Sequence, residues 1–160
     1  MAKNNDSLDL IYEVVRDTLR TQQEQKSSLD TKASMLLLFA GGILALLMNS
    51  WTTLIKFPSI GQIILLVSVS LFAASVILVI FVIWVRKFRI DPEPREFSEK
   101  FLNRPMHETK LQLIANWGET WKYNLDILEQ SSIFLRLSFI AQAMAFGLLG
   151  IALFVSVFRQ

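Results

Sequence analysis

The chain has 160 residues, of which 52% are hydrophobic and only 19% are charged. Soluble domains of this size rarely carry so much apolar sequence, so the composition points to a membrane protein. The chain has no cysteine and a single histidine, His107. Disulfides, thiolate metal sites and a cysteine nucleophile are thereby excluded, and a histidine-based metal cluster or catalytic triad is disfavoured. We expect no metal, no cofactor and no enzymatic activity.

The N-terminal segment, residues 1–32, has the pattern of an amphipathic helix. Apolar residues recur there at helical spacing, namely Leu8, Ile11, Tyr12, Val15 and Leu19. The stripe turns polar after Leu19 and resumes at Leu29. No proline separates this segment from the first apolar run, so we predict one nearly continuous helix from about Ser7 to Asn49.

Three long runs carry no charged residue: Ala33 to Ile55, Phe57 to Val85, and Leu137 to Phe158. Each is long enough for a helix across a hydrocarbon core of about 30 Å. We therefore predict transmembrane helices at residues 33–55, 60–85 and 132–158. In the first, Gly41 and Ala45 form a small-xxx-small pair that favours close helix contact. The second carries a section of small residues for the same purpose: Ser68, Ser70, Ala73, Ala74 and Ser75.

Residues 86–131 form a second polar segment, and Pro105 marks the start of a helix from about residue 106. Apolar or small residues then alternate spacings of three and four, at Leu111, Ile114, Gly118, Trp121, Leu125 and Leu128. This stripe predicts a helix that packs on a partner and continues into the third apolar run without a break. We expect it to pack antiparallel on the Leu8–Leu29 helix, and an intersubunit coiled coil is the alternative.

The cationic residues predict the orientation. Eight lie between Arg86 and Lys122 and five lie in the N-terminal segment, whereas only Lys56 and Arg159 follow the far ends of the spans. The positive-inside rule then places the N-terminus and the central segment in the cytoplasm. The predicted fold class is an all-α membrane protein with three transmembrane helices, of which the first and last extend as long helices into the cytoplasm.

Ionisable residues at the membrane border are the first candidate functional residues. Asp30 and Lys32 precede the first span, and Arg136 lies just inside the third run. Charges at such depth need a partner or water. One interpretation is a polar latch in which Asp30 pairs with Arg136 and which a signal opens. The simpler interpretation is that Lys32 and Arg136 reach the lipid head groups.

The second candidate set lies on the predicted helix after Pro105. Trp117 and Trp121 are four residues apart and share a helix face, and Asn124 lies beside the apolar stripe. We predict that these three residues contact a neighbouring helix. Stacking of the two indoles on a base is the functional alternative.

These features together resemble the small membrane effectors of Pycsar antiphage systems. The resemblance rests on the Leu29-Asp30-Thr31-Lys32-Ala33-Ser34 step, the Phe39-Ala40-Gly41-Gly42 section and Tyr123-Asn124 before the last span. It covers nearly the whole chain from about Leu8. The chain departs from the family near the start of the third span, where a lysine is expected and Arg136 stands instead.

The resemblance implies a function. A partner cyclase would make a cyclic pyrimidine mononucleotide, cUMP or cCMP, during phage infection. This protein would respond by impairing the bacterial inner membrane, which ends the infection by stopping the cell. The resemblance assigns no nucleotide-binding residues, and we expect a homo-oligomer because one subunit is too thin to enclose a pore. The alternatives are a small oligomeric ion channel or a membrane scaffold without nucleotide input.

Overall fold

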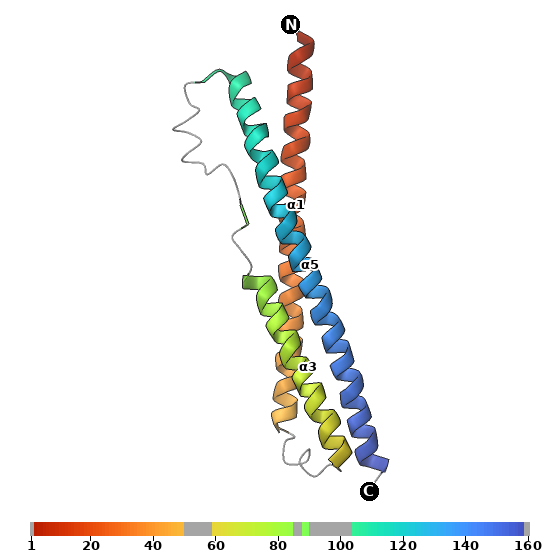
Figure 1. Cartoon of the computed structure of the whole chain (residues 1–160). Coiled ribbons are helices and arrows are strands. Elements are labelled where there is room, and N and C mark those ends of the chain that lie inside the picture. The colour runs from red at the N-terminus through yellow and green to blue at the C-terminus, as the bar shows by residue number, and fades with distance from the viewer. Residues whose placement is uncertain (1, 50–58, 85–87, 90–103, 159–160) are drawn as a thin grey trace. The chain divides into compact units, whose positions relative to one another are not determined.

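The computed structural model describes residues 2–49, 59–84, 88–89 and 104–158. Its helices are α1 (Ala2–Asn49), α3 (Ser59–Trp84) and α5 (Met106–Phe158), shown in Figure 1. All three are long and apolar enough to cross a membrane. The prediction of an all-helical protein with three candidate spans is confirmed. Residues 50–55 of the first predicted span, and most of the polar segment before residue 104, lie outside the described residues.

Helices α1 and α5 are much longer than a membrane span requires. They contain 48 and 53 residues, whereas about 20 cross the hydrocarbon core. The predicted continuity of the first helix is confirmed, since α1 runs unbroken through the Asp30 to Ser34 step. No proline interrupts either helix, so the backbone hydrogen-bond ladder is continuous from the polar sequence into the apolar sequence.

The chain divides into two compact units. Unit 1 comprises Met1–Ser28 and Arg86–Gln130, and unit 2 comprises Leu29–Val85 and Ser131–Gln160. Helices α1 and α5 therefore contribute to both units, whereas α3 belongs to unit 2 alone.

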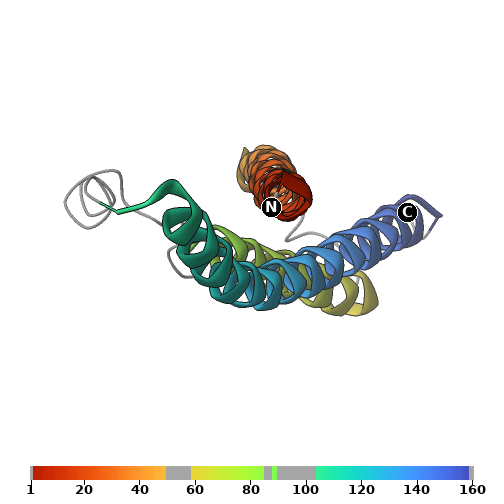
Figure 2. The same cartoon turned by 90° about the horizontal axis from the view of Figure 1, so that it is seen from above.

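Unit 2 is a bundle of three helices, in which α3 runs alongside the later part of α5 (Figures 1 and 2). On α3, the residues near its end pack on Ala33 of α1, and Leu65 near its start packs on Leu47. The order is also reversed between α3 and α5: the later Ser75 of α3 contacts the earlier Ser138 of α5, and the earlier Ser68 contacts the later Ala145. Helix α3 is thus antiparallel to both partners, and α1 and α5 are parallel to each other.

The bundle is held by small residues and by serine hydroxyls. The buried face of α3 repeats every three or four residues and consists of Gly61, Leu65, Ser68, Phe72, Ser75, Val79 and Val82. Ser68 donates to the Ala145 carbonyl at 2.7 Å, and the hydroxyls of Ser75 and Ser138 lie 2.8 Å apart. Such interhelical bonds replace the hydrophobic driving force that helices lack in lipid.

Two details of the small-residue prediction need correction. Ser70, Ala73 and Ala74 are exposed, so only the two buried serines of that section contact α5. On α1, a Cβ added at Gly41 would meet nothing within 4 Å, and Ala45 is exposed. The close approaches of α1 within unit 2 are made instead by other small residues, the fully buried Ala33 and Ala40.

In unit 1, α1 packs on α5 as predicted, but the predicted direction was wrong. Asp9 pairs with Lys110, Tyr12 packs on Trp117, and Gln22 bonds to Trp121, so residue numbers rise together along the two helices. The packing is parallel because α1 and α5 each lead from unit 1 into a span, and α3 makes the return crossing between them.

The predicted stripe on α5 was wrong in part: Leu128 is buried and Ile114 is half-buried, but its other members are exposed. Leu111, Trp121 and Leu125 are 40 to 48% exposed. The buried face is turned away from them and consists of Leu113, Trp117, Thr120, Asn124, Ile127 and Leu128. Spacing of apolar residues alone missed this face because two of its positions are polar. The exposed stripe leaves the intersubunit coiled coil as an untested alternative.

Candidate functional site

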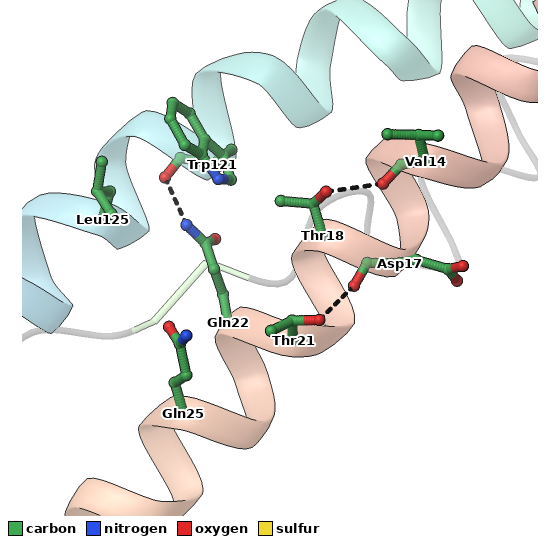
Figure 3. Close-up of a pocket in the computed structure, with 8 residues that line it drawn as sticks. All are labelled: Val14, Asp17, Thr18, Thr21, Gln22, Gln25, Trp121 and Leu125. Carbon is green, nitrogen blue, oxygen red and sulfur yellow. Dashed lines mark hydrogen bonds between the residues drawn. The ribbon is translucent and has the colours of Figure 1, made fainter.

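A groove of about 490 Å³ runs between α1 and α5 in unit 1 (Figure 3). Residues on one face of α1 form most of its wall, because they follow one another at spacings of three and four. Its lining residues are Val14, Asp17, Thr18, Thr21, Gln22 and Gln25 of α1, with Trp121 and Leu125 of α5. We call it the Gln22 groove.

Gln22 is the most unusual residue of this groove. It is only 4% exposed, and Figure 3 shows it reaching from α1 toward Trp121, whose carbonyl accepts a bond from Nε2 at 3.2 Å. That bond fixes the orientation of the Gln22 amide, because the flipped amide would place Oε1 against the Trp121 carbonyl oxygen. Oε1 is then buried without a hydrogen-bond partner among the described residues. A buried acceptor in this state costs about 1 to 3 kcal/mol, which a ligand N–H would recover.

The rest of the groove offers acceptors and an aromatic face. The hydroxyls of Thr18 and Thr21 donate to the carbonyls of Val14 and Asp17, at 2.8 and 2.9 Å, so each oxygen has only its acceptor capacity left for a ligand. Trp121 is 40% exposed. The eight lining residues include the Asp17 carboxylate and no cation. The groove therefore suits a small aromatic molecule with N–H donors and does not by itself attract a phosphate.

Trp117, four residues before Trp121, has a different environment. It is buried, and its ring lies 5.1 Å from that of Tyr12 on α1. Lys110 also joins α5 to α1 beside this ring pair, because its ammonium pairs with Asp9 and lies 5.9 Å from the centre of the Tyr12 ring. The two indoles therefore do not form one stacking platform: Trp117 lies in the core of unit 1, and Trp121 opens on the Gln22 groove.

Asn124 fastens the chain beyond α3 to α5. Its Oδ1 accepts from the backbone N–H of Arg89, and its Nδ2 donates to the Arg89 carbonyl, both at 3.0 Å. The Arg89 guanidinium lies 4.5 Å from the ring centre of Tyr123. Asn124 is 1% exposed, and the backbone of Arg89 supplies a partner for both polar atoms of its buried amide. The Tyr123-Asn124 pair is therefore a structural clamp on Arg89.

The membrane-border residues belong to unit 2, where two of the three meet at a second groove. Lys32 and Arg136 both line it, and both are exposed. Asp30 is half-buried and is not among its lining residues. Gln142 donates to the Leu36 carbonyl, an offset of 106 residues, which sets Arg136 level with Asp30. The equal depth agrees with the latch hypothesis, but the pairing of Asp30 with Arg136 stays a prediction.

Sequence reasoning missed Gln22 as a site residue. A signal was present, because Gln22 continues the spacing of Tyr12, Val15 and Leu19 and so occupies a core position of the α1 stripe. A polar residue at such a position is buried and needs a partner.

The described part of the chain contains no group of three acidic or histidine side chains that would hold a metal ion. Comparison with protein-family models, curated proteins and solved structures gives no match to this chain.

Proposed function

We propose that this chain is a membrane effector of antiphage defence, which a cyclic pyrimidine mononucleotide activates to impair the inner membrane. The observation that carries the proposal is the buried, unpartnered Oε1 of Gln22, a residue that lines a groove together with the exposed Trp121. Helices α1 and α5, which form this groove, also form two of the three candidate spans. A ligand that changes the packing of α1 on α5 in unit 1 therefore acts on helices that continue into the bilayer.

The chemistry of the groove favours a pyrimidine base. Uracil N3–H or the exocyclic amine of cytosine would donate to Gln22 Oε1, and the ring would stack on Trp121. The cyclic phosphate would point away from Asp17, toward solvent or toward a cation of a second copy. Nucleotide binding and homo-oligomer formation are therefore linked in this proposal, because the eight residues that line the groove supply base recognition and no cation for the phosphate.

The distribution of cations supports the orientation that this function requires. Thirteen of the sixteen lysines and arginines precede Ala33 or lie between Arg86 and Lys122. The positive-inside rule places both segments in the cytoplasm, where a cyclase product would be found. A constitutive channel lined by the α3 serines receives less support, because Ser68 and Ser75 use their hydroxyls to bind α5.

Dye-loaded liposomes containing the full chain test the proposal. Addition of cUMP or cCMP should release the dye, and the purine nucleotide cAMP at equal concentration should release much less. Release that is independent of every nucleotide would support the channel alternative. No release with either pyrimidine nucleotide at millimolar concentration would contradict the proposal.

A matched pair of variants locates the site. Gln22→Met keeps the length of the side chain and removes both the Oε1 acceptor and the Nε2 donor to the Trp121 carbonyl, whereas Gln23→Met makes the same change at the next, exposed residue. The nucleotide concentration for half-maximal release should rise about tenfold or more in Gln22→Met, the loss of one buried hydrogen bond. It should not change in Gln23→Met. Equal responses of the two variants would exclude the Gln22 groove as the nucleotide site.

A further inference from the structure

The second groove, in unit 2, has a chemistry that the proposed function does not use. It has a volume of about 820 Å³ and is lined by α1 and α5 alone. Its apolar floor includes Met35, Phe39, Phe139 and Phe146. Lys32 and Arg136 lie at the end that corresponds to the start of both spans. We call it the Lys32–Arg136 groove.

We propose that this groove binds one anionic phospholipid, with the phosphate between Lys32 and Arg136 and an acyl chain along the aromatic floor. Charge complementarity selects this occupant. Both cations are exposed, and the residues that line the groove include no acidic side chain. A lipid phosphate brings negative charge to the depth at which both side chains leave the hydrocarbon.

The apolar part of the groove fits a chain that lies along the helix axes. Leu29, Met35 and Phe39 on α1 line it, and so do Phe139 and Phe146, which lie about two turns apart on α5. The rings of Phe39 and Phe146 lie 5.1 Å apart, and Phe146 also meets the buried Phe72 of α3 edge-on, so the deep end of the groove is closed by packed rings. An acyl chain in this groove would bury apolar surface without breaking a hydrogen bond of any polar group.

A hydrogen bond between α1 and α5 stabilises the shape of the groove. Gln142 is almost fully buried, and its amide joins α5 to the Leu36 carbonyl of α1 across the groove. This bond fixes the register of the two helices, and therefore the spacing of Lys32 and Arg136. A groove with a fixed pair of cations at one end distinguishes an anionic lipid from a zwitterionic one, because only the anionic lipid brings a net charge to the pair.

Native mass spectrometry of the full chain in detergent, titrated with phosphatidylglycerol or with phosphatidylcholine of the same acyl chains, tests the proposal without any nucleotide. The wild type should bind phosphatidylglycerol more tightly, and Lys32→Gln with Arg136→Gln should weaken this binding roughly 30-fold, about fivefold for each cation. The control removes one cation from each of the same helices outside the groove, by Arg20→Gln with Lys122→Gln. The control should keep the preference.

Further arms separate the alternative explanations. The charge-conserving pair Lys32→Arg with Arg136→Lys should restore the preference, which a variant with a merely disturbed fold would not do. Soluble glycerol phosphate should compete poorly, and competition as strong as that of the lipid would overturn the role of the apolar floor. An unchanged preference in the double glutamine variant would overturn the proposal outright.

A crosslink tests the other occupant, a second copy of the chain. Because the sequence has no cysteine, the thiol introduced by Phe139→Cys is unique. This position is exposed and lines the groove. In phosphatidylglycerol bilayers the thiol should form no intermolecular disulfide under mild oxidation. Efficient dimer formation there would assign the groove to a second copy and overturn the lipid assignment.

Discussion

The clamp on Arg89 makes the sharpest prediction about local stability. Asn124→Ala removes two hydrogen bonds of 3.0 Å, one to the backbone N–H of Arg89 and one to its carbonyl. Each such bond is worth about 1 kcal/mol net, so the free energy of local opening should fall by about 2 kcal/mol. Both bonds are partly buried, so this value leaves out any further cost of leaving the Arg89 backbone groups without a partner.

Hydrogen exchange measures this loss directly. The Arg89 amide is a donor to Asn124 in the wild type, so it should exchange slowly, and Asn124→Ala should speed its exchange roughly 30-fold. The measurement uses the full chain in nanodiscs, with the exchange resolved to single residues. Amides at the centre of α3 should keep their protection, because the clamp acts after that helix.

Asn116→Ala is the matched control, because it makes the same substitution on the same helix at an exposed position. It should leave Arg89 exchange unchanged. If Asn124→Ala also leaves it unchanged, the amide does not hold Arg89, and Asn124 is buried for packing alone. If both variants speed exchange equally, the effect comes from α5 as a whole and the clamp is refuted.

The remaining predictions concern the packing within each unit. Trp117→Ala should lower the free energy of unfolding by about 3 to 5 kcal/mol in denaturant titrations, and a loss below about 1 kcal/mol would contradict its buried position. Ser138→Ala should cost about 0.6 to 1.7 kcal/mol, because its hydroxyl bonds to Ser75. Ser131→Ala should be neutral or stabilising in the same denaturant titrations, since its buried hydroxyl has no partner among the described residues, and a loss equal to that of Ser138→Ala would contradict this expectation. Gly41→Ala should leave stability unchanged or raise it by about 0.5 to 1 kcal/mol, and a loss in the thermal unfolding of the purified protein would show a contact that a single copy lacks.

The sequence predicted the elements of this fold well because hydropathy dominates their formation. Charge-free runs of more than twenty residues leave few structures other than a helix that satisfies its own backbone. The absence of proline between Ser7 and Asn49 predicted that the helix would continue through the charged step at Asp30, and α1 does so. Length, helical class and continuity therefore followed from the chain itself.

The sequence predicted less well which face of each helix is buried, because that face depends on the neighbouring helices, which the spacing of apolar residues does not identify. On α5 the apolar residues Leu111, Trp121 and Leu125 gave the clearer spacing, yet Thr120 and Asn124 are buried. The hydrogen bonds of Asn124 to Arg89 offset the cost of burying its amide, and no local pattern encodes that contact. The Gln22 groove was missed for the same reason, since it exists only where α1 meets α5.

The energetics of this polar packing bear on how the protein would respond to a ligand. The buried positions of α5 include five polar residues, namely Thr120, Asn124, Ser131, Ser138 and Gln142, beside buried apolar residues such as Trp117 and Ile127. Interhelical bonds of this kind in lipid are worth about 0.6 kcal/mol on average and less than 2 kcal/mol at most. A ligand that satisfies the buried Gln22 acceptor would contribute about 1 to 3 kcal/mol. The two quantities are comparable, so the proposed activation requires the rearrangement of only a few helix contacts and no unfolding of the bundle.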